Sequence, residues 1–226
     1  LSVWMKRSKF NSRQMIVRAD PDGSHFGTIQ WDTDNVFRLW QAGSYGAIDV
    51  KTSAVYRDPS AWYHLMCVVD TPAATSSDRV KLYVNGELQT ALGATTYPGQ
   101  NTTTAFNYDH DTFGIFDTPG DVETFGGYAS ELYWIDGSAL TPGFFGETNA
   151  QTNQWQPTNP TDIKQAVTFG TNGFYLPFSN DALAASFTDS SDRSVHTLTA
   201  VGGAELDTAI KKIGTASGLF DGTDDV

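Results

Sequence analysis

Short segments in which apolar and polar residues alternate recur along the chain. In the stretch Arg79–Thr90, RVKLYVNGELQT, the residues Val80, Leu82 and Val84 occupy every second position before an Asn-Gly pair. Alternation with a period of two places such residues on one face of a β-strand. Because Asn-Gly readily supplies the two positive-φ positions of a type I′ turn, this stretch predicts a β-hairpin.

Comparable apolar runs, separated by Asx- and Gly-rich turns such as DPDGS and DTDN, fill most of the sequence. The further predicted strands are Leu1–Arg7, Gln14–Ala19, His25–Trp31, Val36–Gln41, Gly46–Thr52, Trp62–Asp70, Thr112–Phe116, Gly127–Gly137, Gly173–Ser179, Val195–Gly203 and Gly214–Val226. One short helix is predicted at Thr141–Thr148, with Thr141 as its N-cap and Pro142 as its first residue. This pattern predicts an all-β fold, an antiparallel β-sandwich.

The composition of the sequence becomes polar after Gly146, where the stretch ETNAQTNQWQPTNPTD begins. We therefore predict a sandwich over residues 1–150, a polar linker or surface crossing over 151–172, and additional strands over 173–226. Trp155, in the middle of the polar stretch, is expected to anchor it to the domain.

Composition narrows the possible partners. The 226 residues are 39% hydrophobic and 13% aromatic, which suffices for one large β-domain or for one domain and part of another. The formal net charge is −12, so repulsion disfavours nucleic acids and anionic membrane surfaces. Neutral glycans, cations and basic protein patches remain open as partners.

The single cysteine, Cys67, excludes a disulfide within the chain and a cysteine-based zinc cluster. Its apolar neighbours in WYHLMCVVD predict a buried thiol. Insertion into a membrane is not expected, because no apolar run approaches the ~20 residues of a membrane span. No signal peptide is visible. The chain begins at Leu1 within strand-like sequence, which we interpret as a sign of a processed or partial polypeptide.

Two segments, AWYHLMCVVDTPAATSSDRVKLYVNGELQT and GYASELYWIDGSALTPGFFGET, resemble the laminin-G-like, concanavalin A-type jelly roll. The combination of TPGFFGETN with GTNGFYLPFS is similar to modules in tail and fibre proteins of bacteriophage virions. The resemblance covers most of residues 1–179 and implies a jelly-roll sandwich.

The rear segment, DSSDRSVHTLTAVGGAELDTAIKKIGTASGLFDGTDDV, resembles the opening strands of a laminin-G-like domain. The rear part therefore completes the same sandwich in circularly permuted order, completes a neighbouring subunit by strand swapping, or begins a second domain. Unpaired strands such as GLFDG would expose apolar edges, which favours completion within or between chains.

Glucanases share the jelly roll, and retaining glycoside hydrolysis needs two carboxylates about 5 Å apart. Glu131 and Asp136 differ by five positions and so are predicted to point to opposite faces of a strand. Asp121 and Glu123 have suitable parity but lie in a Gly- and Pro-flanked loop. His64 lacks a nucleophile motif and is interpreted as a satisfied sheet histidine. The chain is therefore expected not to be an enzyme.

Binding chemistry is predicted in the loops. Two pairs of acids, Asp20 with Asp22 and Asp109 with Asp111, offer hard oxygen ligands for calcium at the sandwich rim, and Asx turns are the alternative. Glycan binding requires flat aromatic rings beside amides. The candidates for it are Tyr45, Tyr97, Asn101, Asn107, Tyr108 and Trp155.

These observations and the resemblance together predict a non-enzymatic structural or adhesion module of a phage virion. It would bind host surface glycans through its rim loops, in several copies, and a homo-oligomer is expected. The alternatives are a purely structural virion protein that contacts neighbouring virion proteins and a carbohydrate-active hydrolase.

Overall fold

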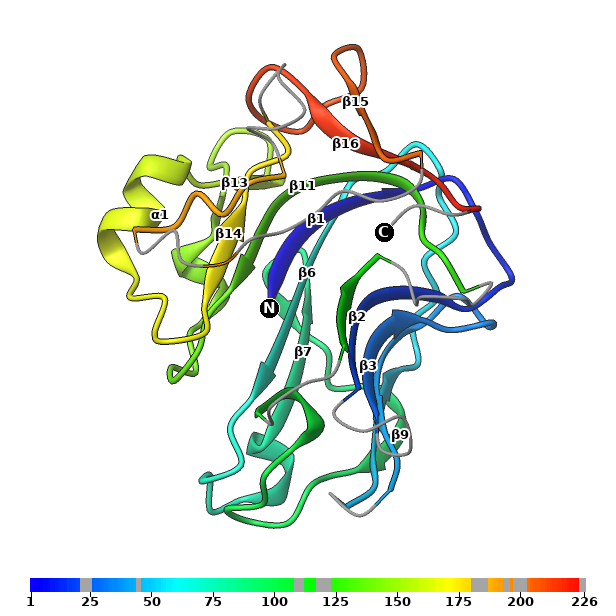
Figure 1. Ribbon diagram of the computed structural model, residues 1–226, viewed down its shortest axis with the longest axis vertical. Coiled ribbons are helices and arrows are strands. Elements are labelled where there is room, and N and C mark those ends of the chain that lie inside the picture. The colour runs from blue at the N-terminus through cyan, green and yellow to red at the C-terminus, as the bar shows by residue number, and fades with distance from the viewer. Residues whose placement is uncertain are drawn as a thin grey trace.

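The alternating segments form two antiparallel sheets that stack face to face, as the computed structural model shows (Figure 1). The structure describes residues 1–20, 26–43, 46–107, 112–116, 123–179, 187–192, 196 and 203–223. The predicted all-β, antiparallel sandwich is confirmed. No helix in these described ranges is both long and apolar enough to cross a membrane.

Sheet A has eight strands, and β14 pairs with its strand β11 beside the main path. Its order is β15 (Glu205–Asp207), β16 (Ser217–Asp221), β11 (Gly126–Trp134), β1 (Ser2–Arg7), β6 (Tyr63–Val69), β7 (Val80–Val84) and β8 (Glu87–Leu88), with β14 at Phe174–Leu176.

Sheet B has six strands. Its order is β10 (Thr112–Ile115), β2 (Gln14–Asp20), β3 (Gly27–Trp31), β4 (Phe37–Gln41), β5 (Ile48–Thr52) and β9 (Leu92–Thr96). The remaining elements are the strand pair β12 (Gly146–Thr148) and β13 (Trp155–Pro157), the helix α1 (Pro160–Ala166), and the 3₁₀ turns η1 (Ser76–Asp78), η2 (Ala105–Asn107) and η3 (Pro142–Phe144).

The period-two pattern explains which side chains form the core between the sheets. In β4, Phe37 and Leu39 are fully buried in that core, whereas Arg38 and Trp40 are half-buried on the other face of sheet B. The same alternation in β7 buries Leu82 in the core.

The predicted hairpin is confirmed. Strands β7 and β8 pair across Asn85 and Gly86, whose φ angles are 51° and 80°. Both signs match the type I′ turn that the Asn-Gly pair predicted.

The rear strands lie in the same sheet as the front ones. Both β14 and β16 pair with one edge of β11, while β1 pairs with its other edge. The register of β1 with β11 shifts between the part of β11 that pairs with β16 and the part that pairs with β14. There Glu131 has a φ of 57°, and its backbone N–H donates to the carbonyl of Pro177 at 3.1 Å. The side chains of Phe178 and Phe220 are buried in the core between the sheets.

A second, smaller core lies on the outer face of sheet A, where α1 packs (Figure 1). It contains Tyr133, Phe145, Ile163 and Tyr175. The helix lies inside residues 151–172, the stretch that the sequence predicted to be a polar linker or surface crossing, and no helix was predicted there.

The helix predicted at Thr141–Thr148 is also corrected. Only the 3₁₀ turn Pro142–Phe144 forms, and the Thr141 side chain makes no capping hydrogen bond. The residues after it form β12 instead. The predicted strand Val195–Gly203 lies outside the described residues except for His196 and Gly203.

Candidate ligand-binding site at one end of the sandwich

A cavity of about 1070 Å³ opens at the end of the sandwich where β6 and β11 finish and β14 begins. Antiparallel pairing brings these three strand ends together, because the register aligns Trp134 of β11 with Phe174 of β14. The floor is apolar and includes Ile29 and Cys67 from the inner faces of both sheets.

Four aromatic side chains form the wall around this floor. The rings of Trp134 and Phe174 stack with an interplanar angle of 10° and centroids 6.3 Å apart. Phe113 meets Trp134 edge-on at 5.2 Å, and Phe106 of η2 lies 6.1 Å from it. Trp134 and Phe174 are on the core side of sheet A, since the adjacent Tyr133 and Tyr175 belong to the outer core.

One rim of the cavity is polar and comes from two loops that dock on each other. Asp70 and Thr71 follow β6, and Asn101, Thr102 and Thr103 belong to the loop after β9. The backbone N–H of Asn101 donates to the carbonyl of Thr71 at 2.9 Å, which joins the loops. The Asn101 side chain is exposed, so its amide can reach a ligand.

A second part of the rim is formed by Asp136 and Asn172. Asn172 donates its backbone N–H and its side-chain amide to one carboxylate oxygen of Asp136, at 3.1 and 3.3 Å. The backbone N–H of Asp136 donates to the carbonyl of Phe169 at 2.9 Å. Gly170 supports this turn with a φ of 79°, and a side chain there would clash with the carbonyl of Asp136.

His196 completes the lining on the side of Phe174, whose ring is 6.0 Å from the imidazole. Its Nε2 atom is buried and has no hydrogen-bond partner among the described residues. A hydroxyl group of a ligand would supply one, because a hydroxyl can both donate and accept a hydrogen bond.

The structure brings one of the predicted ligand-binding residues, Asn101, to the cavity. Tyr97 packs against the main core instead, and neither it nor Trp155 lines the cavity. Tyr45 and Tyr108 lie outside the described residues, and only the backbone of Asn107, at the end of η2, is described.

Trp155 anchors its segment to the domain, as the sequence led us to expect. Its indole N–H donates to Nδ1 of His64 at 3.0 Å, and its ring lies so close to Gly86 and Gly146 that neither could carry a side chain without displacing it. The polar edge of its ring is thus already bound within the protein, and the ligand-binding role also predicted for it stays a prediction.

His64 and Cys67 occupy the buried positions predicted for them. Since the tryptophan N–H can only donate, Nδ1 of His64 accepts and Nε2 carries the proton toward the hydroxyl of Ser2, 2.8 Å away. Burial, with a smaller contribution from Lys212, lowers the pKa of His64 to about 3, and burial raises the pKa of Cys67 to about 12. Both side chains are neutral near pH 7.

The calcium prediction rests mainly on residues that the structure does not describe. Asp22, Asp109 and Asp111 lie outside the described residues. Asp20 pairs with Arg18 at 2.9 Å. Among the described residues no group of three or more His, Cys, Asp or Glu side chains could hold a metal ion.

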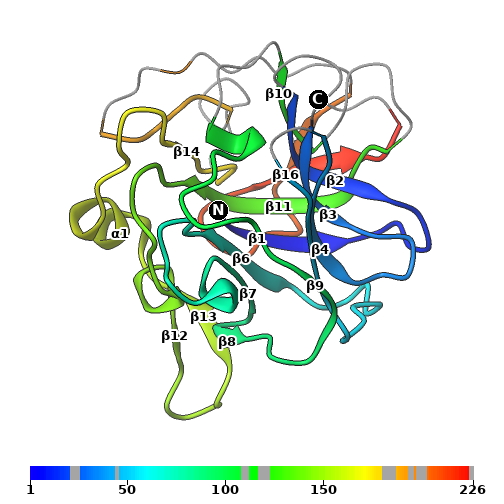
Figure 2. The same ribbon diagram turned by 90° about the horizontal axis from the view of Figure 1, so that it is seen from below.

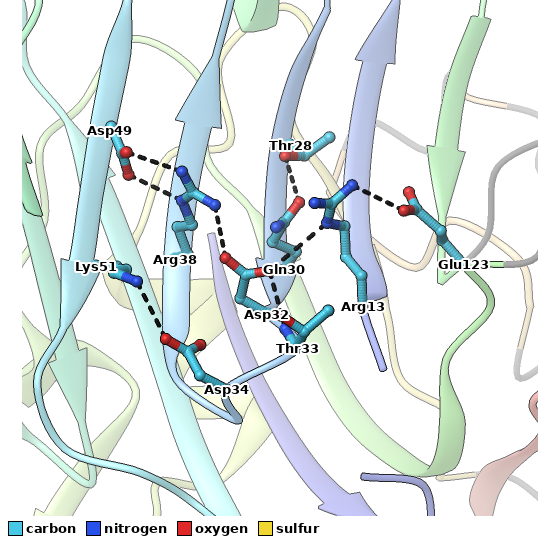
Figure 3. A network of polar contacts seen from close by, with 10 residues as sticks. All are labelled: Arg13, Thr28, Gln30, Asp32, Thr33, Asp34, Arg38, Asp49, Lys51 and Glu123. Carbon is cyan, nitrogen blue, oxygen red and sulfur yellow. Dashed lines mark hydrogen bonds and ion pairs between the residues drawn. The ribbon is translucent and has the colours of Figure 1, made fainter. Parts of the chain in front are cut away.

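A second polar surface covers the outer face of sheet B, where ion pairs run across adjacent strands (Figure 3). Arg38 binds both carboxylate oxygens of Asp49 at 2.8 Å and one oxygen of Asp32 at 2.6 Å. Asp32 also lies 3.6 Å from Arg13, whose other partner is Glu123 at 2.8 Å. These ion pairs link β4 to β5 and connect β4 to the residues that flank β3 and β2.

The electrostatics of this network follow from its pairing. Burial alone would raise the pKa of Asp32, but hydrogen bonds from the Thr33 backbone N–H and from Arg38, together with the charges of Arg38 and Arg13, outweigh it and lower the pKa. Burial alone would lower the pKa of Arg38, but its hydrogen bonds to Asp49 and Asp32 and the charges of these two acids outweigh it and raise the pKa.

Glu131 has the carboxyl with the most unusual environment. It is buried and accepts hydrogen bonds from the hydroxyls of Tyr133 and Tyr175, both at 2.6 Å. Burial raises its pKa to about 7, although these two tyrosines, Ser179 and Lys164 act in the opposite direction. Glu131 does not line the cavity, whereas Asp136 does.

Sequence reasoning missed most of the cavity. Trp134 and Phe174 were predicted as strand residues, and nothing in the local pattern shows that their strands end side by side. The polar residue Asn172, two positions before the apolar run of β14 begins, was the available signal.

The family model for the concanavalin A-like lectin/glucanases superfamily matches residues 1–143. The chain therefore belongs to this superfamily, as its resemblance implied. A search of curated proteins finds no match.

Among solved structures, the chain is similar to domain 4 of AbnA, a GH43 extracellular arabinanase from Geobacillus stearothermophilus, in complex with arabinotriose. The identity is 24%, and the TM-score is 0.41. The match covers 56% of this chain and 54% of that one, so it spans about half the length of each.

Proposed function

We propose that the protein is a non-enzymatic carbohydrate-binding module that holds a glycan in the cavity at the end of the sandwich. The observation that carries this proposal is the stacked pair Trp134 and Phe174 inside an open cavity with an amide-, hydroxyl- and carboxylate-bearing rim. A sugar has an apolar face that stacks on an aromatic ring and hydroxyls that bond to such groups.

Each part of the cavity has a role in this proposal. Trp134 provides the stacking surface, and Asn101 and Asn172 bond to hydroxyls from the two rims. The unpartnered Nε2 of His196 takes one more hydroxyl. Because both sheets fix the strand ends, little conformational freedom is lost on binding.

We also propose that the module belongs to a phage virion and recognises host surface glycans there. The similarity of Thr141–Asn149 and Gly170–Ser179 to virion modules supports this location. Binding at one such site is weak, so several copies in a homo-oligomer would raise the avidity.

Calcium at the loops of Asp20, Asp22, Asp109 and Asp111 is a further prediction, which EDTA treatment followed by a glycan-binding measurement tests.

The non-enzymatic assignment is supported by the state of four described acids. Asp32, Asp49 and Glu123 are bound in ion pairs, and Glu131 is buried against two tyrosine hydroxyls. Incubation with the glycans that bind should release no new reducing ends. Release that depends on Glu131 or Asp136 would instead establish a hydrolase.

The binding proposal is tested with the substitutions Trp134→Leu and Trp40→Leu. Both tryptophans are half-buried, but only Trp134 lines the cavity. On a glycan array and in titration calorimetry, Trp134→Leu should weaken binding by at least about tenfold, whereas Trp40→Leu should leave it unchanged. Absence of binding by a multivalent form of the wild type would favour a purely structural virion protein.

A further inference from the structure

The charged side chains that line the cavity among the described residues are carboxylates. Asp70 and Asp136 both belong to the lining, and no described lysine or arginine does. Every lysine and arginine except Arg193 belongs to the described residues.

Two cationic groups, the Arg79 side chain and the amino group of the lining residue Leu1, donate hydrogen bonds to backbone carbonyls. The guanidinium of Arg79 donates to the carbonyls of Ala73, Ala74 and Pro98 at 2.9 to 3.0 Å. The amino group of Leu1 donates to the carbonyl of Cys67 at 3.0 Å, and burial lowers its pKa. Both groups are therefore hydrogen-bonded within the protein.

We propose that this cavity selects neutral oligosaccharides and rejects those that carry uronate or sulfate groups. The inference rests on the function proposed above and adds the class of ligand. Its basis is the pair of carboxylates Asp70 and Asp136 around a cavity without a described lysine or arginine.

Two physical effects produce the selection. Sugar hydroxyls donate hydrogen bonds to carboxylates, and such charge-assisted bonds are stronger than bonds between neutral groups. An anionic substituent about 6 Å from one carboxylate, at an effective dielectric constant of about 40, weakens binding by about tenfold. The net charge of −12 adds repulsion at longer range, which salt screens.

The test uses pairs of oligosaccharides that share length and linkage, one neutral and one bearing a uronate or a sulfate. An array identifies the pairs, and calorimetry at 0.15 M salt measures both members. The neutral member should bind at least about tenfold more tightly.

Two double variants separate the effect of the cavity carboxylates from the effect of the net charge. Asp70→Asn with Asp136→Asn should reduce the affinity ratio between the neutral and the anionic oligosaccharide by at least about threefold. Glu87→Gln with Glu205→Gln changes the net charge equally at exposed positions away from the cavity, and should leave the difference intact. Because Asp136 supports its turn, Asp70→Asn alone serves as a second variant, and near-ultraviolet circular dichroism verifies folding.

The outcomes distinguish the two proposals. Equal or tighter binding of the anionic member would overturn the selection and leave glycan binding intact. Equal effects of the two double variants would assign the selection to overall charge and also overturn it. Binding of neither member would overturn the proposed function together with this inference.

Discussion

At the scale of single residues, burial decides how Glu131 ionises. Its carboxyl lies against Tyr133 and Tyr175, whose rings stack at 4.4 Å on the face of sheet A that α1 covers. The one described cation beside this cluster is Lys164, whose Nζ lies 5.8 Å from the Tyr175 ring. The second carboxylate oxygen of Glu131 has no hydrogen-bond partner among the described residues.

The raised pKa of Glu131 has a defined effect on stability. Between its ordinary value of 4.5 and about 7, the folded state binds the proton and the unfolded state has lost it. Stability therefore falls as the pH rises through this interval, by up to about 3 kcal/mol. The substitution Glu131→Gln should remove this fall and stabilise the protein at pH 8 relative to the wild type.

Urea unfolding of both proteins at pH 5 and pH 8 measures this difference, since other titrating groups contribute equally to both. His64, with its lowered pKa, acts in the opposite direction and destabilises the fold as the pH falls below its ordinary value of 6.5. A constant difference between the two proteins across the range would contradict the account of Glu131.

The sequence alone predicted the burial of individual side chains where an apolar run surrounds them, as for His64 and Cys67. It could not predict the environment of Glu131, because Tyr175 is 44 positions away and reaches it through the pairing of β14 with β11. The glycan candidates were chosen from loops, whereas Trp134 is the last residue of a strand.

At the scale of elements, the hairpin of β7 and β8 depends on Gly86 for two reasons. Its φ is positive, and a side chain there would come within 2.6 Å of the Trp155 ring. Gly86→Ala should therefore destabilise the fold by about 2 kcal/mol. Gly143→Ala is the matched control, because that position has open space and no positive φ, and it should change stability by less than about 0.5 kcal/mol.

Thermal and urea unfolding of these two variants measure the prediction. If both alanine variants unfold at the same urea concentration, the role of Gly86 in the turn and under Trp155 is refuted.

The sequence contains a start signal for helix α1 that the sequence analysis did not use. Asn159 accepts a hydrogen bond from the backbone N–H of Thr161, Pro160 follows it, and Asp162 lies in the first turn. These are the residues that start helices. The low apolar content of the segment hid the helix, since Ile163 is its one buried residue.

At the scale of the whole molecule, the rear strands share a core with the front ones. Phe220 of β16 is 1% exposed, and its ring lies 4.6 Å from that of Phe116. Phe220→Ala should cost about 3 to 5 kcal/mol of stability and lower a single unfolding transition of the whole chain. Leu219→Ala, at the half-exposed neighbouring position, should cost about 1 kcal/mol.

Calorimetry and urea unfolding measure both variants. A second, independent transition that responds to Phe220→Ala while the main one stays unchanged would show that the rear strands fold as a separate unit.

The sandwich itself was predictable because alternation and turn chemistry are local properties of the sequence. The sequence left open which sandwich the rear strands join, since that depends on contacts between residues far apart in the chain. In the structure β16 lies beside β11, and the small sheet of β12 and β13 lies at the opposite side of the molecule from sheet B (Figure 2). The cavity likewise arises only when distant strand ends meet.

The most direct test of glycan binding at the cavity is a titration of the ¹⁵N-labelled protein with a neutral oligosaccharide that binds on the array, followed by amide chemical shifts. The proposal predicts that the largest changes cluster at Asn101, Trp134, Asp136 and Asn172. Changes centred instead on the outer face of sheet B around Trp40, with the cavity residues unaffected, would contradict it.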